Sequence, residues 1–167
     1  MYEFLEDERF LEARKNKQYF FFGSIPLATP GWDDVFGNLE KSIEEQSLVK
    51  IGPYFSLVTH NGDKHIKRAG EFLEEIRKLD TSLSGSAHVY IGLTKFSESF
   101  GKHKDNCETF FWQAIGSTSW KVFTQTGVKE HVLNAGDMIY VPRYMEHEVA
   151  SLSPRVGISF GLDYGSP

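Results

Sequence analysis

The sequence is poor in cysteine and has no long apolar run. Cys107 is the single cysteine among 167 residues, which excludes an intramolecular disulfide, a cysteine-rich zinc module and a cysteine-ligated iron–sulfur cluster. No apolar stretch approaches the roughly 18–20 residues that a membrane-spanning helix needs. The acidic segment Met1–Arg9 lacks the basic and apolar regions of a signal peptide. We therefore expect a cytoplasmic protein without membrane contact.

Basic charge is also in short supply. The chain has 18 Lys and Arg against 23 Asp and Glu, a net charge of −5, so we expect no nucleic-acid partner. It has no glycine-rich phosphate loop and no Gly-x-Ser-x-Gly elbow, which disfavours nucleotide hydrolysis and serine-hydrolase chemistry. With 40% hydrophobic and 25% charged residues, the composition is that of one globular domain over residues 1–167.

This single domain has two parts with different sequence patterns. Residues 1–80 show helical periodicity over 3–16, 32–47 and 67–79, and strand-like runs at 18–22 and 50–60. Residues 81–167 contain short β-type runs separated by Gly, Ser, Asn and Pro: 88–93, 109–114, 120–123, 131–133, 138–141, 146–150 and 155–162. Strands at this spacing predict an all-β sandwich or barrel, and we expect the two or three N-terminal helices to pack outside it.

A His-x-Asp pair precedes the aromatic run of the barrel region. His103 and Asp105 are two residues apart, so on a strand both side chains would face the same side. The later stretch Gly136–His147 contains a Gly-Asp turn, an apolar run and Pro142, with His147 five residues after the proline. If the strands of a small barrel face each other, His147 can reach the same cation as the first pair.

Two imidazoles and one carboxylate match the facial triad of non-haem Fe(II) oxygenases, which leaves three positions of an octahedron open. A 2-oxo acid can occupy two of these positions and leave the third for dioxygen. His-x-Asp alone is common by chance, and an isolated histidine is more often structural than a ligand. The ordered combination of both stretches within barrel-like sequence favours a metal site.

The ordered pattern resembles the JmjC-type, or cupin-like, 2-oxoglutarate- and Fe(II)-dependent hydroxylases. Their motifs run from His-x-Asp through Gln-x-x-Gly and Trp to Gly-Asp, an aliphatic run, Pro and a final His. This chain has, in that order, His103, Asp105, Gln113, Gly116, Trp120, Gly136, Asp137, Tyr140, Val141, Pro142 and His147. The resemblance implies a mainly β, double-stranded β-helix (cupin or jelly-roll) barrel. It also implies Fe(II) held by His103, Asp105 and His147, with 2-oxoglutarate as co-substrate.

The residues expected at the co-substrate depart from the family pattern. A Lys or Arg commonly stands two residues after the motif glycine, where this chain has Thr118. A neutral hydroxyl binds a carboxylate more weakly than a charged side chain does. Other 2-oxoglutarate oxygenases place an Arg on the strand after the distal His, and Arg155 follows His147 by eight residues. Arg155 is therefore one expected replacement, and Lys121 is a second basic candidate.

Four further residues complete the expected surroundings of the metal. Thr109 stands where the family often has an Asn that contacts the co-substrate, and Tyr54 is another candidate hydroxyl donor. Glu108 is a candidate fourth ligand by analogy with ordinary cupins, but strand alternation predicts that it points away, into solvent or a salt bridge. Cys107 has the parity of the ligand face, and we expect a small buried core residue there.

The sequence thus favours an Fe(II)- and 2-oxoglutarate-dependent dioxygenase, a hydroxylase of a protein side chain or a small molecule. The alternative is a metal-binding cupin of another class: an isomerase, a dioxygenase that needs no 2-oxo acid, or a small-molecule sensor. A non-catalytic barrel for protein association is the third hypothesis. Barrels of this kind often dimerise, so a homodimer is one expected state. Binding of 2-oxoglutarate to the iron-loaded protein separates the first two hypotheses.

Overall fold

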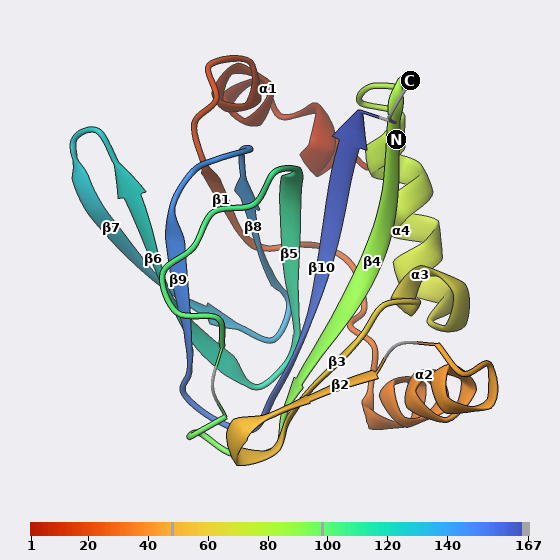
Figure 1. Cartoon of the computed structure of the whole chain (residues 1–167). Coiled ribbons are helices and arrows are strands. Elements are labelled where there is room, and N and C mark those ends of the chain that lie inside the picture. The colour runs from red at the N-terminus through yellow and green to blue at the C-terminus, as the bar shows by residue number, and fades with distance from the viewer. Residues whose placement is uncertain (48, 98, 165–167) are drawn as a thin grey trace.

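Ten antiparallel strands in two facing sheets form the body of the protein in the computed structural model, which describes residues 1–47, 49–97 and 99–164 (Figure 1). The larger sheet contains β1 (Phe20–Ser24), β2 (Val49–Gly52), β3 (Ser56–Thr59), β4 (Leu83–Gly92), β5 (Glu108–Ile115), β8 (Asp137–Val141) and β10 (Arg155–Tyr164). The smaller sheet contains β6 (Ser117–Thr124), β7 (Gly127–Asn134) and β9 (His147–Ser151). The strand orders are β1-β8-β5-β10-β4-β3-β2 and β7-β6-β9.

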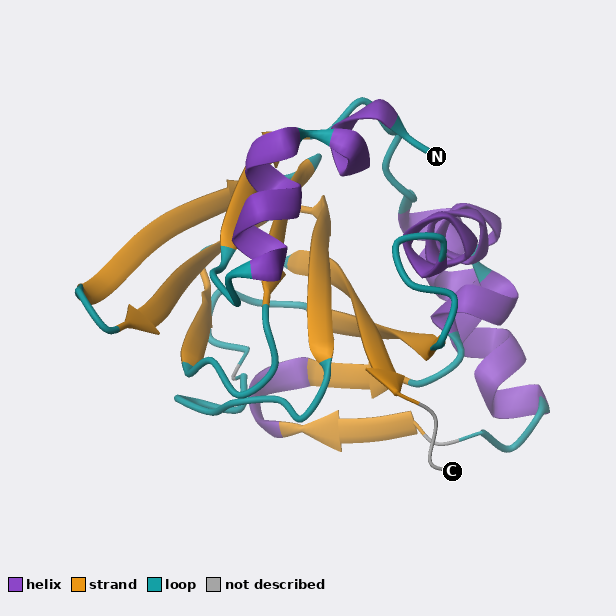
Figure 2. Ribbon diagram, turned by 90° about the horizontal axis from the view of Figure 1, so that it is seen from above, coloured by secondary structure: helices purple, strands orange, loops and turns teal. Residues whose placement is uncertain are grey.

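Short helices cover the outside of the strands, as Figure 2 shows. They are η1 (Glu3–Glu6), α1 (Glu8–Lys15), α2 (Trp32–Glu44), η2 (Pro53–Phe55), α3 (Gly62–His65) and α4 (Lys67–Arg77). Helix α4 forms because its apolar residues recur at helical spacing, and this stripe is buried: Ala69, Phe72, Leu73 and Ile76. Asp7 caps α1, since its carboxylate accepts a hydrogen bond of 2.8 Å from the backbone N–H of Arg9.

The predicted mainly β fold with N-terminal helices outside is confirmed, and each of the seven β-type runs after residue 80 overlaps a strand. One prediction was wrong. The expected strand at 50–60 is two antiparallel strands, β2 and β3, separated by η2. The chain reverses there because Tyr54 and Phe55 adopt positive φ angles of 53° and 62°, a conformation that a continuous strand excludes.

The central strands of the larger sheet are covered on both faces. The face under the helices forms the main core, which includes Phe10, Phe72, Phe110, Trp112 and Phe160, all with 0% exposure. The face toward the smaller sheet forms a second apolar cluster. This inner cluster is Phe111, Trp120, Val122, Leu133, Ile139, Val141 and Val149.

Candidate metal centre

Two backbone hydrogen bonds hold the first and third predicted ligands together. His103 lies in the loop between β4 and β5, and His147 is the first residue of β9. The N–H of His103 donates to the carbonyl of His147 at 2.9 Å, and the N–H of His147 donates back at 2.8 Å. Asp105 is tied to the same region, because its carbonyl accepts a bond of 2.8 Å from the N–H of Tyr144. His103 and Asp105 therefore lie in a loop and not, as expected, on a regular strand, and the bridge brings His147 beside them.

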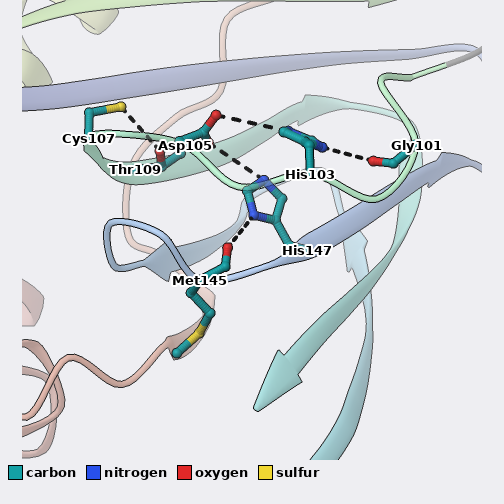
Figure 3. Close-up of polar contacts among 7 residues, drawn as sticks. All are labelled: Gly101, His103, Asp105, Cys107, Thr109, Met145 and His147. Atoms are coloured by element: carbon teal, nitrogen blue, oxygen red, sulfur yellow. Dashed lines mark hydrogen bonds and ion pairs between the residues drawn. The ribbon is translucent and has the colours of Figure 1, made fainter. Parts of the chain in front are cut away.

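The three side chains converge on one point (Figure 3). Nε2 of His147 lies 3.6 Å from Oδ2 of Asp105, and Nε2 of His103 lies 4.0 Å from Oδ1 of the same carboxylate. One ligand atom from each residue falls within 4.8 Å of the others. Oγ1 of Thr109 donates to Oδ2 of Asp105 at 3.2 Å and so orients the carboxylate.

The donor set fits a divalent metal ion. Nδ1 of His103 lies 2.8 Å from the carbonyl of Gly101, and Nδ1 of His147 lies 3.1 Å from the carbonyl of Met145 (Figure 3). A carbonyl can only accept, so each Nδ1 carries the proton and each Nε2 keeps its lone pair. Burial lowers the pKa of His147 and outweighs the opposing hydrogen bond to the Met145 carbonyl, so the neutral imidazole that binds metals is favoured. Two imidazoles and one carboxylate suit Fe(II) and leave coordination positions open.

The triad borders a cavity of about 330 Å³ between the two sheets. Its lining combines the three predicted ligands with polar and apolar residues of both sheets: Tyr90, Ser99, Phe100, His103, Asp105, Thr109, Phe111, Trp120, His147, Val149, Arg155 and Ser159. The cavity therefore includes two of the five co-substrate candidates, Thr109 and Arg155.

Arg155 is a buried cation in this lining, with only 4% of its surface exposed. Its Nε donates to Oγ of Ser151 at 2.9 Å, and that hydroxyl donates to the carbonyl of Ser97 at 2.9 Å. Within the described part of the chain, no carboxylate lies at ion-pair distance from the guanidinium. Burial lowers the pKa of Arg155 to about 10, so the side chain stays charged at neutral pH. Such a charge is costly without an anion beside it.

The other residues predicted for the co-substrate lie elsewhere. Thr118 is fully buried and bonded inside the protein, with Oγ1 donating to Oε1 of Gln113 at 2.7 Å. Tyr54 is 60% exposed in the turn between β2 and β3. The side chain of Lys121 is exposed, and its Nζ lies 4.0 Å from a carboxylate oxygen of Glu148. The structure therefore does not bring these three side chains to the cavity.

Glu108 points away from the metal centre as predicted. Its carboxylate pairs with Arg14 at 2.8 Å, and both side chains are largely buried. Cys107 is half-buried, and its Sγ lies 3.8 Å from Oγ1 of Thr109. The cysteine is not part of the cavity lining. The three ligand candidates thus receive no fourth protein donor from this stretch.

Sequence reasoning missed several residues around the cavity. Tyr90 lines it from β4, and burial raises the pKa of its hydroxyl to about 12, which keeps the phenol protonated. The two serines that support Arg155, Ser151 and Ser97, also belong to no motif. Outside the cavity, Nδ1 of His60 lies 3.3 Å from Nε2 of His88, a contact that the sequence spacing did not indicate. Strand alternation could have placed Tyr90 on the inner face, but not in the same cavity as Arg155.

The fold and this site define a jelly-roll β-barrel with a two-histidine, one-carboxylate centre between its sheets. The JmjC domain family matches residues 65–166, more than half of the chain, so the chain belongs to the JmjC domain family. This confirms the predicted resemblance. No curated protein sequence matches the chain. No helix in the described ranges is both long and apolar enough to cross a membrane.

Solved structures share the fold at low sequence identity. A ribosomal oxygenase from Escherichia coli, YcfD, aligns with a TM-score of 0.59 and 19% identity, covering 71% of this chain and 33% of that one. A second YcfD structure, in complex with cobalt and 2-oxoglutarate, gives the same score and identity, with 71% and 34% covered. A variant of oxalate decarboxylase from Bacillus subtilis aligns with a TM-score of 0.52 and 11% identity, covering 74% and 29%. The chain thus spans about a third of the length of these proteins.

Proposed function

We propose that the protein is an Fe(II)- and 2-oxoglutarate-dependent oxygenase, specifically a hydroxylase of a protein side chain or a small molecule. The observation that carries this proposal is Arg155. A buried guanidinium without a carboxylate partner among the described residues shares one cavity with a facial triad. A dicarboxylate that binds the metal at one end and the guanidinium at the other would occupy the open coordination positions and also supply the anion that the buried cation lacks.

His103, Asp105 and His147 are the residues that hold the iron. Bound Fe(II) supplies the redox chemistry that couples dioxygen reduction to oxidative decarboxylation of a 2-oxo acid. The protein's part is to fix the ligands before the ion arrives. The Gly101 and Met145 carbonyls hold the two imidazoles in the Nδ1–H tautomer.

Arg155 is the anchor for the far carboxylate of 2-oxoglutarate. Its planar fork can form two parallel charge-assisted hydrogen bonds, which favours a dicarboxylate over a monocarboxylate. Ser151 already holds Nε, so the guanidinium is oriented before the co-substrate binds. The Thr109 and Tyr90 hydroxyls add polar contacts, while Phe111 and Val149 give the cavity an apolar wall that excludes water.

The comparison with solved structures supports the same co-substrate. YcfD, which shares the fold, has been solved in complex with cobalt and 2-oxoglutarate, and also with cobalt and succinic acid. Succinate is the product expected from oxidative decarboxylation of 2-oxoglutarate, in which carbon dioxide leaves and one oxygen atom of dioxygen enters the new carboxylate. YcfD is a ribosomal oxygenase, which is consistent with a protein substrate for this chain as well.

An anaerobic titration tests the proposal. Metal-free protein is loaded with Fe(II), 2-oxoglutarate is added, and the visible metal-to-ligand charge-transfer band of the chelate is followed. We expect a saturable band in the native protein and in Glu130→Gln, which removes an exposed carboxylate on β7, and no band in Asp105→Ala. Iron binding without a band would instead favour the alternative cupin class. Absence of iron binding would contradict both.

A further inference from the structure

A chain of buried hydrogen bonds runs from β5 to β6 beside the proposed metal ligand His147. Oγ1 of Thr118 donates to Oε1 of Gln113 at 2.7 Å, and Nε1 of Trp120 donates to Oγ1 of Thr118 at 3.2 Å. All three side chains are 0–1% exposed, so water does not compete for these bonds. The Thr118 hydroxyl uses its single proton on Gln113 and one lone pair on Trp120.

The start of this chain is fixed by backbone carbonyls. Nε2 of Gln113 donates to the carbonyls of Ile115 at 2.8 Å and Val156 at 3.3 Å. Its amide can therefore face Thr118 only with its oxygen, which sets the direction of every bond that follows. Gly116 allows the tight turn from β5 to β6 that brings Gln113 and Thr118 together, because its φ is +68° and a Cβ there would overlap the carbonyl of Pro154. Thr118 must then donate to Gln113 and accept from Trp120.

The end of the chain lies against the metal centre. The rings of Trp120 and His147 are stacked, with centroids 5.4 Å apart and planes within 13°. The two residues come from paired strands, where Val122 is opposite His147 and Trp120 is opposite Val149. The Met145 carbonyl fixes the position of Nδ1 of His147, and the indole fixes the tilt of its ring. Together the two contacts determine where Nε2 points.

We infer that Thr118 and Trp120 are positioning residues that set the orientation of His147 toward the metal ion, an inference that rests on the function proposed above. Thr118 stands where related hydroxylases commonly carry a basic co-substrate residue, but here its hydroxyl faces Trp120 and Gln113 instead of the cavity. Removing the hydroxyl leaves two buried polar groups without a partner, and the indole can shift from the plane that matches His147. Loss of a group bonded directly to a metal ligand typically costs about 10–100-fold in metal affinity, and Thr118 acts on His147 through Trp120, so we expect an effect near the lower end of this range.

Cobalt(II) titration of the metal-free protein tests the inference, because its visible d–d spectrum reports ligand geometry without turnover. Thr118→Val keeps the volume and removes the hydroxyl. We expect about tenfold or greater loss of Co(II) affinity and an altered spectrum. Thr118→Ser should restore both. Trp120→Phe, which keeps a ring over His147 and loses the N–H, should fall between Thr118→Val and the native protein.

Thr59→Val is the matched control for a purely structural effect. Thr59 is also fully buried and accepts a hydrogen bond of 2.7 Å from Nδ2 of Asn38, on the helix-covered side of the sheet. We expect it to lower thermal stability as Thr118→Val does, with a native Co(II) spectrum. Native affinity and spectrum in Thr118→Val, or equal losses in both variants, would overturn the inference. Failure of the native protein to bind Co(II) would contradict the proposed function itself.

Discussion

The two faces of the seven-stranded sheet are built from the same strands for opposite purposes. Along β10, alternate residues face the helices, and all of them are apolar with 0% exposure: Val156, Ile158, Phe160 and Leu162. The intervening residues face the smaller sheet and are small or polar: Arg155, Gly157, Ser159 and Gly161. One face is filled completely, and the other keeps space and charge for the cavity.

The size of the two clusters shows where stability resides. The helix-covered core contains 22 buried apolar residues, and the inner cluster contains seven. Because stabilisation scales with apolar area removed from water, most of it comes from the helix-covered face. The inner face is thereby free to hold features that are costly on their own, such as the buried guanidinium of Arg155, which has no carboxylate at ion-pair distance among the described residues. This difference leads to four predictions that separate folding from ligand binding.

Removal of a ring from the helix-covered core should have the largest effect. Phe72 is fully buried, with ring centroids 4.9 Å from Phe160 and 6.1 Å from Trp112. Phe72→Ala should lower the free energy of unfolding by about 3–5 kcal/mol, which urea denaturation measures. Co(II) affinity of the folded variant should stay native. A loss below about 1 kcal/mol would contradict the assignment of stability to this face.

A methyl group added to the inner face should show how tightly its side chains pack against β10. A Cβ on Gly157 would overlap the ring of Phe111, whereas one on Gly161 would lie 3.2 Å from Sγ of Cys107. Gly157→Ala should therefore destabilise the protein by about 1–3 kcal/mol and Gly161→Ala by less, as judged by denaturant midpoints. Equal effects at the two positions would show that the inner face adapts freely.

Replacement of the buried cation should affect binding without affecting folding. Arg155→Met removes the charge and one hydrogen bond to Ser151. The free energy of unfolding should change by no more than about 1 kcal/mol, because removal of a buried charge offsets the lost hydrogen bond. Affinity of the iron-loaded protein for 2-oxoglutarate should fall at least about tenfold, since a charge-assisted pair is lost. Lys121→Met should change neither quantity, and a native affinity in Arg155→Met would refute the anchor role.

The smallest effect concerns pH. Burial lowers the pKa of His131, whose ring lies 4.7 Å from Phe21 at the edge of the inner cluster. The unfolded chain then binds this proton more readily than the native protein, so stability is full above a pH of about 6.5 and falls as pH drops toward the lowered pKa. The lowered pKa of His147 likewise makes the metal-free protein less stable as the pH falls. His131→Gln should reduce the dependence of the melting temperature on pH between pH 7 and 5. An unchanged dependence would contradict the role of His131.

Much of the fold could be predicted because local patterns decide it. Short apolar runs with Gly and Pro between them marked each barrel strand, and the spacing of Phe72 and Ile76 marked the helix face. The reversal at Tyr54 and Phe55 was not visible, since neither residue is a usual one at positive φ. The three ligand candidates were predictable because their order along the chain is characteristic.

The surroundings of the ligands were less predictable, because they depend on which residues lie opposite one another. The family pattern placed Thr109 at the site, where it lines the cavity, and parity placed Glu108 away from the ligands, where it pairs with Arg14. Parity also placed Cys107 on the ligand face, but this residue does not line the cavity. Thr118 could not be placed in the same way. Whether its hydroxyl faces the cavity or Gln113 depends on how β6 follows β5, which no local pattern reports.

The reciprocal hydrogen bonds between His103 and His147 have a consequence for how the centre is filled over time. The backbones of His103 and His147 are hydrogen-bonded to each other, so an ion that reaches the folded protein meets two imidazoles that are already fixed relative to each other. Loading then requires little reorganisation, unlike sites that fold only around their metal. An ion can accordingly be lost and exchanged while the barrel stays intact. Loss of this bridge would detach the His103 loop from β9, whereas His147 would stay paired with Val122 of β6.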